Sequence, residues 1–179
     1  RAAIPEARTA ARRARSLDPN LAEAYASEGV IYMYEQLVRS GQKNGPAALE
    51  VLTRAVKLKP SYAQAHHWLG ALYLELGRPE AGLRHLRLAV ELRPDNFSAR
   101  RSLVDALIAN EKYQAALAEA RHLQARYPER GAWRILKGEA LLHLKRWSEV
   151  RALAERQRKS AEDPPGWALF FRALVDAAT

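Results

Sequence analysis

Apolar residues return every three or four positions along this chain, and charged residues occupy the opposite side of each run. Between residues 79 and 92, for example, Leu83, Leu86 and Val90 alternate with Arg84 and Arg87. This spacing matches the turn of an α-helix, so each run predicts an amphipathic helix with one apolar face. The chain read in this way contains roughly ten helices: one over 3–17, four pairs beginning near Ala22, Ala63, Phe97 and Gly131, and a last one over 166–177.

Glycine and proline mark the ends of these helices. Gly77 is followed by Arg78 and Pro79, and Pro94 comes directly after the next apolar run. Glycine suits the C-terminus of a helix and proline its first turn, whereas a proline further on stops a helix because it lacks an amide donor. The segment 63–96 therefore predicts a helix, a tight turn, a second helix and a stop.

The same unit recurs along the chain with a period of 34 residues. Pro60, Pro94 and Pro128 follow one another at this interval, and so do Trp133 and Trp167. A fixed period of this length is the signature of a repeat architecture, in which stacked helix pairs bury a shared core.

One repeat is seven residues longer than the others, since Pro19 and Pro60 are 41 residues apart. The extra residues lie between Tyr32 and Ala47. Seven residues make about two helical turns, so we expect the first helix of this repeat to run through Val38, before a loop from Ser40 to Pro46. A longer loop between the two helices is the alternative.

These intervals divide the chain into repeats within a single domain, residues 1–179, and the predicted fold is all-α. We expect a half repeat at 1–19, full repeats at 20–62, 63–96, 97–130 and 131–163, and a terminal half repeat at 164–179.

The residues at fixed places in this unit resemble the tetratricopeptide repeat family. Trp68, Leu69, Gly70 and Tyr73 match its first helix, although the tryptophan is displaced by two positions, and the second helix carries Gly82, Leu86, Ala89 and Pro94. The resemblance implies a right-handed superhelix of antiparallel helices that acts as a non-enzymatic scaffold for protein partners. The segments 17–29 and 65–78 are also similar to repeat regions of bacterial regulators and secretion scaffolds, and the Arg, Ala and Leu bias favours a bacterial source.

Small residues recur in the middle of the first helices, at Gly29, Gly70 and Gly138. A glycine inside a helix costs about 1 kcal/mol relative to alanine, so its recurrence predicts that two helix backbones approach closely there.

The resemblance also implies that first helices line a concave binding wall. The positions where some family members carry a clamp of Lys, Asn and Arg for a peptide carboxylate hold Ala26, Val30, Trp68, Ser98 and Ser102, so we do not expect that binding mode. We instead expect an extended or helical partner segment with apolar anchors. The predicted groove residues are Glu23, Met33, Tyr34, Gln64, His67, Arg101, Asp105 and Glu139.

The last predicted helix is more apolar than a solvent-facing end should be. We expect either another element to cover it or a second copy of the chain to dimerise through it. The residues that predict such a contact are Trp167, Phe170, Phe171 and Leu174.

The net charge of +9 makes anionic partners worth weighing. A column of arginines on the second helices predicts a basic stripe that offers a nucleic acid or lipid surface as an alternative function. Aromatic residues are not interleaved with this column, so we do not expect nucleic acid to be the partner. The arginines are Arg12, Arg13, Arg54, Arg87 and Arg121.

The sequence offers little for catalysis or metal binding. It contains no cysteine, and the adjacent His66 and His67 diverge by about 100° on a helix, too far to share one metal ion. No nucleophile and base, paired carboxylates or phosphate-binding loop is visible, so we expect no enzyme, cofactor or metal. The chain begins with Arg1 instead of Met, which is compatible with an excised or processed fragment. Cytoplasm and periplasm both stay open, with the cytoplasm slightly favoured, and no transmembrane segment is expected.

Overall fold

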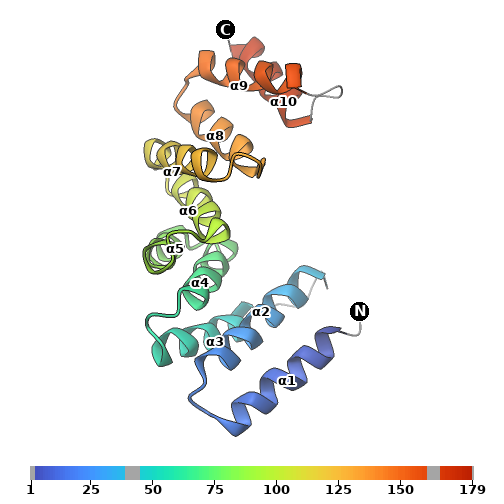
Figure 1. Ribbon diagram of the computed structural model, residues 1–179, viewed down its shortest axis with the longest axis vertical. Helices are drawn as coiled ribbons and strands as arrows, with labels where there is room; N and C mark the ends of the chain where they lie inside the picture. Colours follow the sequence, from blue (N-terminus) through green and yellow to red (C-terminus); the bar gives the residue numbers. More distant parts are fainter. Residues whose placement is uncertain (1–2, 39–44, 161–165, 179) are drawn as a thin grey trace. The chain divides into compact units, whose positions relative to one another are not determined.

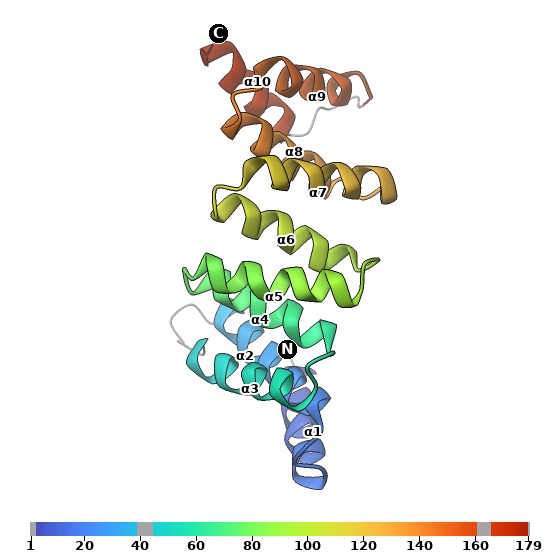
Figure 2. The same cartoon turned by 90° about the vertical axis from the view of Figure 1, so that its left-hand side faces the viewer.

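The computed structural model describes residues 3–38, 45–160 and 166–178. These residues form helices and no strand, which confirms the all-α prediction (Figures 1 and 2). None of the described helices is long and apolar enough to cross a membrane. The helices are α1 (Ala3–Leu17), α2 (Ala22–Val38), α3 (Gly45–Leu58), α4 (Ala63–Glu75), α5 (Pro79–Leu92), α6 (Phe97–Ala109), α7 (Tyr113–Arg126), α8 (Ala132–His143), α9 (Trp147–Ser160) and α10 (Gly166–Ala178).

The helix that precedes the long connection, α2, extends through Val38 as the seven extra residues predict. The following helix, α3, already begins at Gly45. The prediction of a loop through Pro46 is therefore wrong at its end, because proline is well accommodated in the first turn of a helix. The rest of the predicted loop, residues 39–44, lies outside the described residues.

The chain divides into two compact units, residues 1–102 and residues 103–179, and the boundary falls within α6. In unit 1 the main helix pairs are α2 with α3 and α4 with α5, around a core that includes Leu52, Leu69 and Leu86. In unit 2, α7 packs on α8, and α9 packs on α8 and α10, with Leu117 and Leu141 fully buried. The predicted repeat boundaries remain predictions.

The turns between paired helices repeat with the period of the sequence. Gly77, Glu111 and Lys145 follow one another at intervals of 34 residues, and all three have a positive φ, at 68°, 57° and 56°. After each of them, the next amide donates a hydrogen bond back to a carbonyl five residues earlier, for example Arg78 N to Tyr73 O at 2.8 Å. This is the bonding of a helix C-terminus that ends in a left-handed residue. The backbone turn is thus kept even where glycine is replaced.

In unit 1, α4 and α5 approach each other closely at Gly70 and Gly82. A Cβ atom added to Gly70 would lie 2.6 Å from Leu86 Cγ and 3.1 Å from the Gly82 carbonyl oxygen. A Cβ atom added to Gly82 would lie 2.9 Å from the Gly70 carbonyl oxygen. The prediction from the glycine column, that two helix backbones approach closely at this point, is confirmed for this pair.

A pair of histidines lies beside this contact. His66 Nε2 is 3.0 Å from the Pro60 carbonyl oxygen, so this nitrogen carries the proton and donates it. His66 Nδ1 is then the acceptor for His85 Nδ1, which lies 3.0 Å away. Only one proton fits in that gap. Burial and the neighbouring His66 and Arg84 lower the pKa of His85 to about 4, and burial also lowers the pKa of His66.

Replacing Gly70 with leucine should overpack the contact between α4 and α5. We expect Gly70→Leu to lower the free energy of unfolding by about 1–3 kcal/mol, because Leu86 and the Gly82 backbone leave no room for a larger side chain. Ala71→Leu, one position further along α4, adds the same helix-forming side chain away from this contact and should cost less. Thermal unfolding followed by circular dichroism compares the two. Melting of Gly70→Leu at the parent temperature would refute the close-packing account.

The histidine pair predicts a pH dependence of stability. Because the pKa of His85 is depressed in the folded state, the unfolded chain binds its proton more readily, and stability is lost as pH falls from about 6.5 to about 4. The melting temperature of the wild type should fall over this window, and that of His85→Asn, which keeps a donor near the Nδ1 position, should fall less. Parallel melting profiles for the two proteins would show that the pair does not titrate as described.

Candidate functional site

A groove of about 620 Å³ in unit 1 lies where α1, α2 and the start of α4 meet. Its α1 wall consists of small side chains, at Ala7, Ala10 and Ala14, which leave space that larger residues would fill. Ala11 of α1 also lines the groove. The rest of the wall is mostly apolar and includes two aromatic rings, those of Tyr62 and Trp68. The residues of this wall are Leu21, Glu23, Ala24, Ala26, Ser27, Val30, Ile31, Tyr62, Gln64 and Trp68.

The polar edge of the groove is formed by an ion pair between α2 and the end of α3. Lys59 Nζ donates a hydrogen bond to Glu23 Oε1 at 2.6 Å, and Lys59 Nζ also lies 5.3 Å from the centre of the Tyr62 ring. The lysine lowers the pKa of Glu23, and the carboxylate in turn raises the pKa of Lys59. The Glu23 charge is therefore matched, and the groove offers a partner mainly apolar surface.

Part of the predicted groove set lies together in unit 1. Glu23 and Gln64 line the groove, and so do Ala26, Val30 and Trp68, three of the positions where a carboxylate clamp would carry polar side chains. Met33 packs against the core of unit 1, and Tyr34 is 55% exposed. Arg101 is exposed but does not line the groove, whereas Asp105 and Glu139 belong to unit 2.

His67 is inside the protein instead of on a binding wall. It is 4% exposed, its Nε2 lies 3.1 Å from Ser102 Oγ, and its ring stacks on Trp68 with centroids 4.9 Å apart. Burial lowers the pKa of His67, which keeps the ring neutral. The His67 side chain thus connects α4 to α6 through Ser102, and its ring packs against the ring of Trp68. Within the described residues, no three histidine, aspartate or glutamate side chains gather as metal ligands.

Buried charges between α1 and α2 are a feature that the sequence analysis does not identify. Glu28 is 2% exposed and accepts a hydrogen bond from Arg15 at 2.7 Å, with Arg12 3.6 Å away. Glu35 is 8% exposed and forms an ion pair with Arg8. The signal is present in the sequence, because Arg8, Arg12 and Arg15 share one helical face and the two glutamates are seven residues apart on the next helix. These pairs fix α1 beside the groove.

The apolar residues of α10 divide between the core and the surface. Phe171 is 4% exposed and packs over Gly138 of α8, so it is available to no second subunit in this arrangement. Phe170 is 57% exposed and Leu174 38%, while Trp167 is half-buried with its ring edge on Phe171. Self-association through α10 stays a prediction that now depends on Phe170 and Leu174.

Two of the five arginines in the predicted basic stripe lie beside a carboxylate. Arg121 lies 3.4 Å from Glu149, and Arg12 is close to Glu28. The predicted stripe draws its arginines from both units, since Arg121 belongs to unit 2 and the other four to unit 1. Anion binding by the whole stripe therefore remains a prediction.

Several structures in the same fold resemble this chain. YrrB, described as a TPR protein with an unusual peptide-binding site, superposes with a TM-score of 0.78 at 18% identity, over 95% of this chain and 84% of that chain. TTC0263, a thermophilic TPR protein of Thermus thermophilus, gives 0.66 at 21% identity, over 79% and 74% of the two chains. An O-GlcNAc transferase mutant of Thermobaculum terrenum gives 0.58 at 28% identity, over 69% of this chain but 23% of the enzyme.

Sequence models of one family match most of the chain. The TPR repeat model matches residues 42–77, and tetratricopeptide repeat models match residues 63–96 and 101–164. No curated protein sequence gives a significant match. The repeat models, the helix pairs and the recurrent turns agree, and the chain belongs to the tetratricopeptide repeat family, whose members typically serve as non-enzymatic scaffolds for protein interactions.

Proposed function

We propose that this protein binds an extended or helical segment of a partner protein in the groove between α1, α2 and α4, as part of a larger bacterial regulator or assembly complex. The observation that carries the proposal is the groove itself, about 620 Å³ of space with mostly apolar walls. Pockets of this size and character are common ligand sites in proteins. Peptide binding on this fold has a precedent in YrrB.

The groove suits a segment with one or two large apolar side chains. Its α1 wall of alanines leaves depth, and Trp68 and Tyr62 offer half-buried ring surface opposite. Large aromatic residues at partly buried positions supply much of the binding energy in protein interfaces. Gln64 also lines the groove, and its amide can donate and accept hydrogen bonds to a peptide backbone.

The groove is poorly suited to a peptide that ends in a free carboxylate. Ala26 and Val30 replace polar clamp residues, and the lysine at the edge, Lys59, is already paired with Glu23. A free carboxylate would lose its hydration in this groove without gaining a charged partner. We therefore expect internal apolar motifs to be selected over acidic C-termini.

Filling the groove from α1 tests this proposal. Ala10 is exposed and lines the groove, so Ala10→Phe should occupy the space without disturbing the core. A phage-displayed library of random peptides is panned on the wild type, and the enriched peptides are measured against both proteins by fluorescence anisotropy. We expect enrichment of peptides with apolar anchors, and at least about tenfold weaker binding to Ala10→Phe, because contacts at a hot spot are lost.

The neighbouring Thr9→Phe is the matched control, since Thr9 is also exposed on α1 but does not line the groove. It should bind the selected peptides as the wild type does. Enrichment of no peptide, or equal losses in the two variants, would contradict groove binding.

A further inference from the structure

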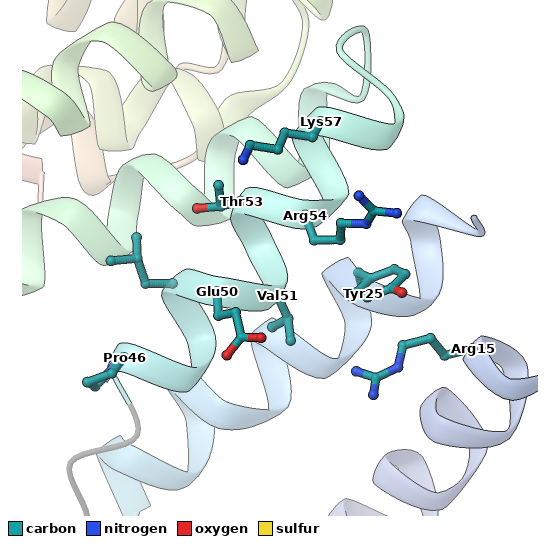
Figure 3. Close-up of a pocket in the computed structure, with 9 residues that line it drawn as sticks. Arg15, Tyr25, Pro46, Glu50, Val51, Thr53, Arg54 and Lys57 are labelled. Carbon is teal, nitrogen blue, oxygen red and sulfur yellow. The ribbon is translucent and has the colours of Figure 1, made fainter. Parts of the chain in front are cut away.

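A second pocket, of about 660 Å³, lies between α1 and α3 and is separate from the groove (Figure 3). Three of its lining residues are cations, namely Arg15, Arg54 and Lys57, whereas Glu50 is the one carboxylate among them. Tyr25 of α2 forms part of the pocket between the two arginines. None of these residues lines the groove, so the two sites can be tested independently.

The charges contributed by α3 have no counterion in the described part of the chain. Arg54 and Lys57 form no ion pair there, although Glu50 precedes Arg54 by one helical turn on the same helix. A Glu and Arg at this spacing commonly pair. The Arg54 side chain instead extends away from Glu50, on the side of α3 where Tyr25 and Arg15 lie (Figure 3).

The opposite side of the pocket is held in place before any ligand arrives. Arg15 donates a hydrogen bond to the buried Glu28 at 2.7 Å, and its guanidinium carbon is 5.2 Å from the centre of the Tyr25 ring. The Tyr25 hydroxyl in turn donates to the Pro19 carbonyl oxygen at 3.0 Å. One hydrogen bond leaves other donors of Arg15 available, because a guanidinium has five N–H groups. A partner would therefore meet an arginine whose orientation is already fixed.

We propose that the pocket between α1 and α3 binds an acidic segment of a protein partner. Carboxylates of this segment bond to Arg54, Lys57 and the free donors of Arg15, since bonds between such cations and carboxylates are charge-assisted. An apolar side chain of the same segment packs on Leu49 and Pro46, which also line the pocket.

A peptide fits the pocket better than a nucleic acid does. Three cations line this pocket, and Glu50 beside them would repel a continuous run of phosphates. Binding of a nucleic acid backbone depends on neutralising many successive phosphates. A peptide can instead place isolated carboxylates beside the cations and keep an apolar residue between them.

The test uses the complete chain and a fluorescently labelled peptide of repeated Glu-Glu-Leu, measured by anisotropy at low salt. We expect binding that weakens about tenfold or more in the double variant Arg54→Gln with Lys57→Gln, because two charged contacts are removed. A Lys-Lys-Leu peptide of the same length should not bind. Binding should also weaken as salt is raised, because the charges are solvent-accessible.

Two variants serve as controls. Arg87→Gln with Arg93→Gln removes the same charge from exposed positions of unit 1 outside the pocket, and should leave the affinity within about twofold of the wild type. Ala10→Phe, which fills the groove, should not affect this peptide, so failure of one site is distinguishable from failure of the other. The proposal is overturned if the acidic peptide does not bind, if both double variants weaken it equally, or if oligothymidine is the ligand whose binding depends on Arg54 and Lys57.

Discussion

The approach of α4 and α5 at Gly70 and Gly82 is the contact on which the rest of unit 1 depends. The backbone of each helix occupies the space that a Cβ atom on the other would need. Leu69, Leu72 and Leu86, which flank this contact on the two helices, are all fully buried. The tight pairing of α4 and α5 gives unit 1 a rigid frame, and the groove lies where α4 meets α1 and α2.

The contact between α1 and α2 follows a different principle. Whereas α4 and α5 meet at two glycines, α1 is fixed by arginines that pair with the buried Glu28 and Glu35. Removing one partner of a buried ion pair is costly, so these pairs specify how α1 lies. The alanines of α1 are then free to form a groove wall, and Arg15 is held at the edge of the second pocket. One helix thus shapes both proposed sites.

Much of the fold can be predicted from the sequence because its signals are local. The spacing of apolar residues predicts the helices, and Gly77 predicts the turn between α4 and α5; the structure repeats that turn at Glu111 and Lys145, with the same interval of 34 residues. The glycine column predicts the contact between α4 and α5. The end of the loop before α3 is predicted wrongly because Pro46 suits a loop and a first helical turn equally well, and it lies in a first turn.

The sites are harder to predict because they depend on neighbours distant in sequence. Helical position alone places His67 on a binding wall, but Ser102 lies where it can bond the ring, and the ring is buried. Sequence spacing places Arg54 in a long basic stripe, but Arg15 of α1 and Tyr25 of α2 line the same pocket. Helical periodicity gives the face on which a residue lies and leaves open what packs against that face.

Unit 1 is proposed to receive a protein segment between α1, α2 and α4. The most direct measurement is mapping of amide chemical-shift changes by NMR when a peptide selected from a random library is added to the isotope-labelled chain. The account predicts that the largest changes fall on groove residues such as Ser27, Val30, Gln64 and Trp68. Changes confined to α7 through α10, with none in α1, α2 or α4, would contradict it.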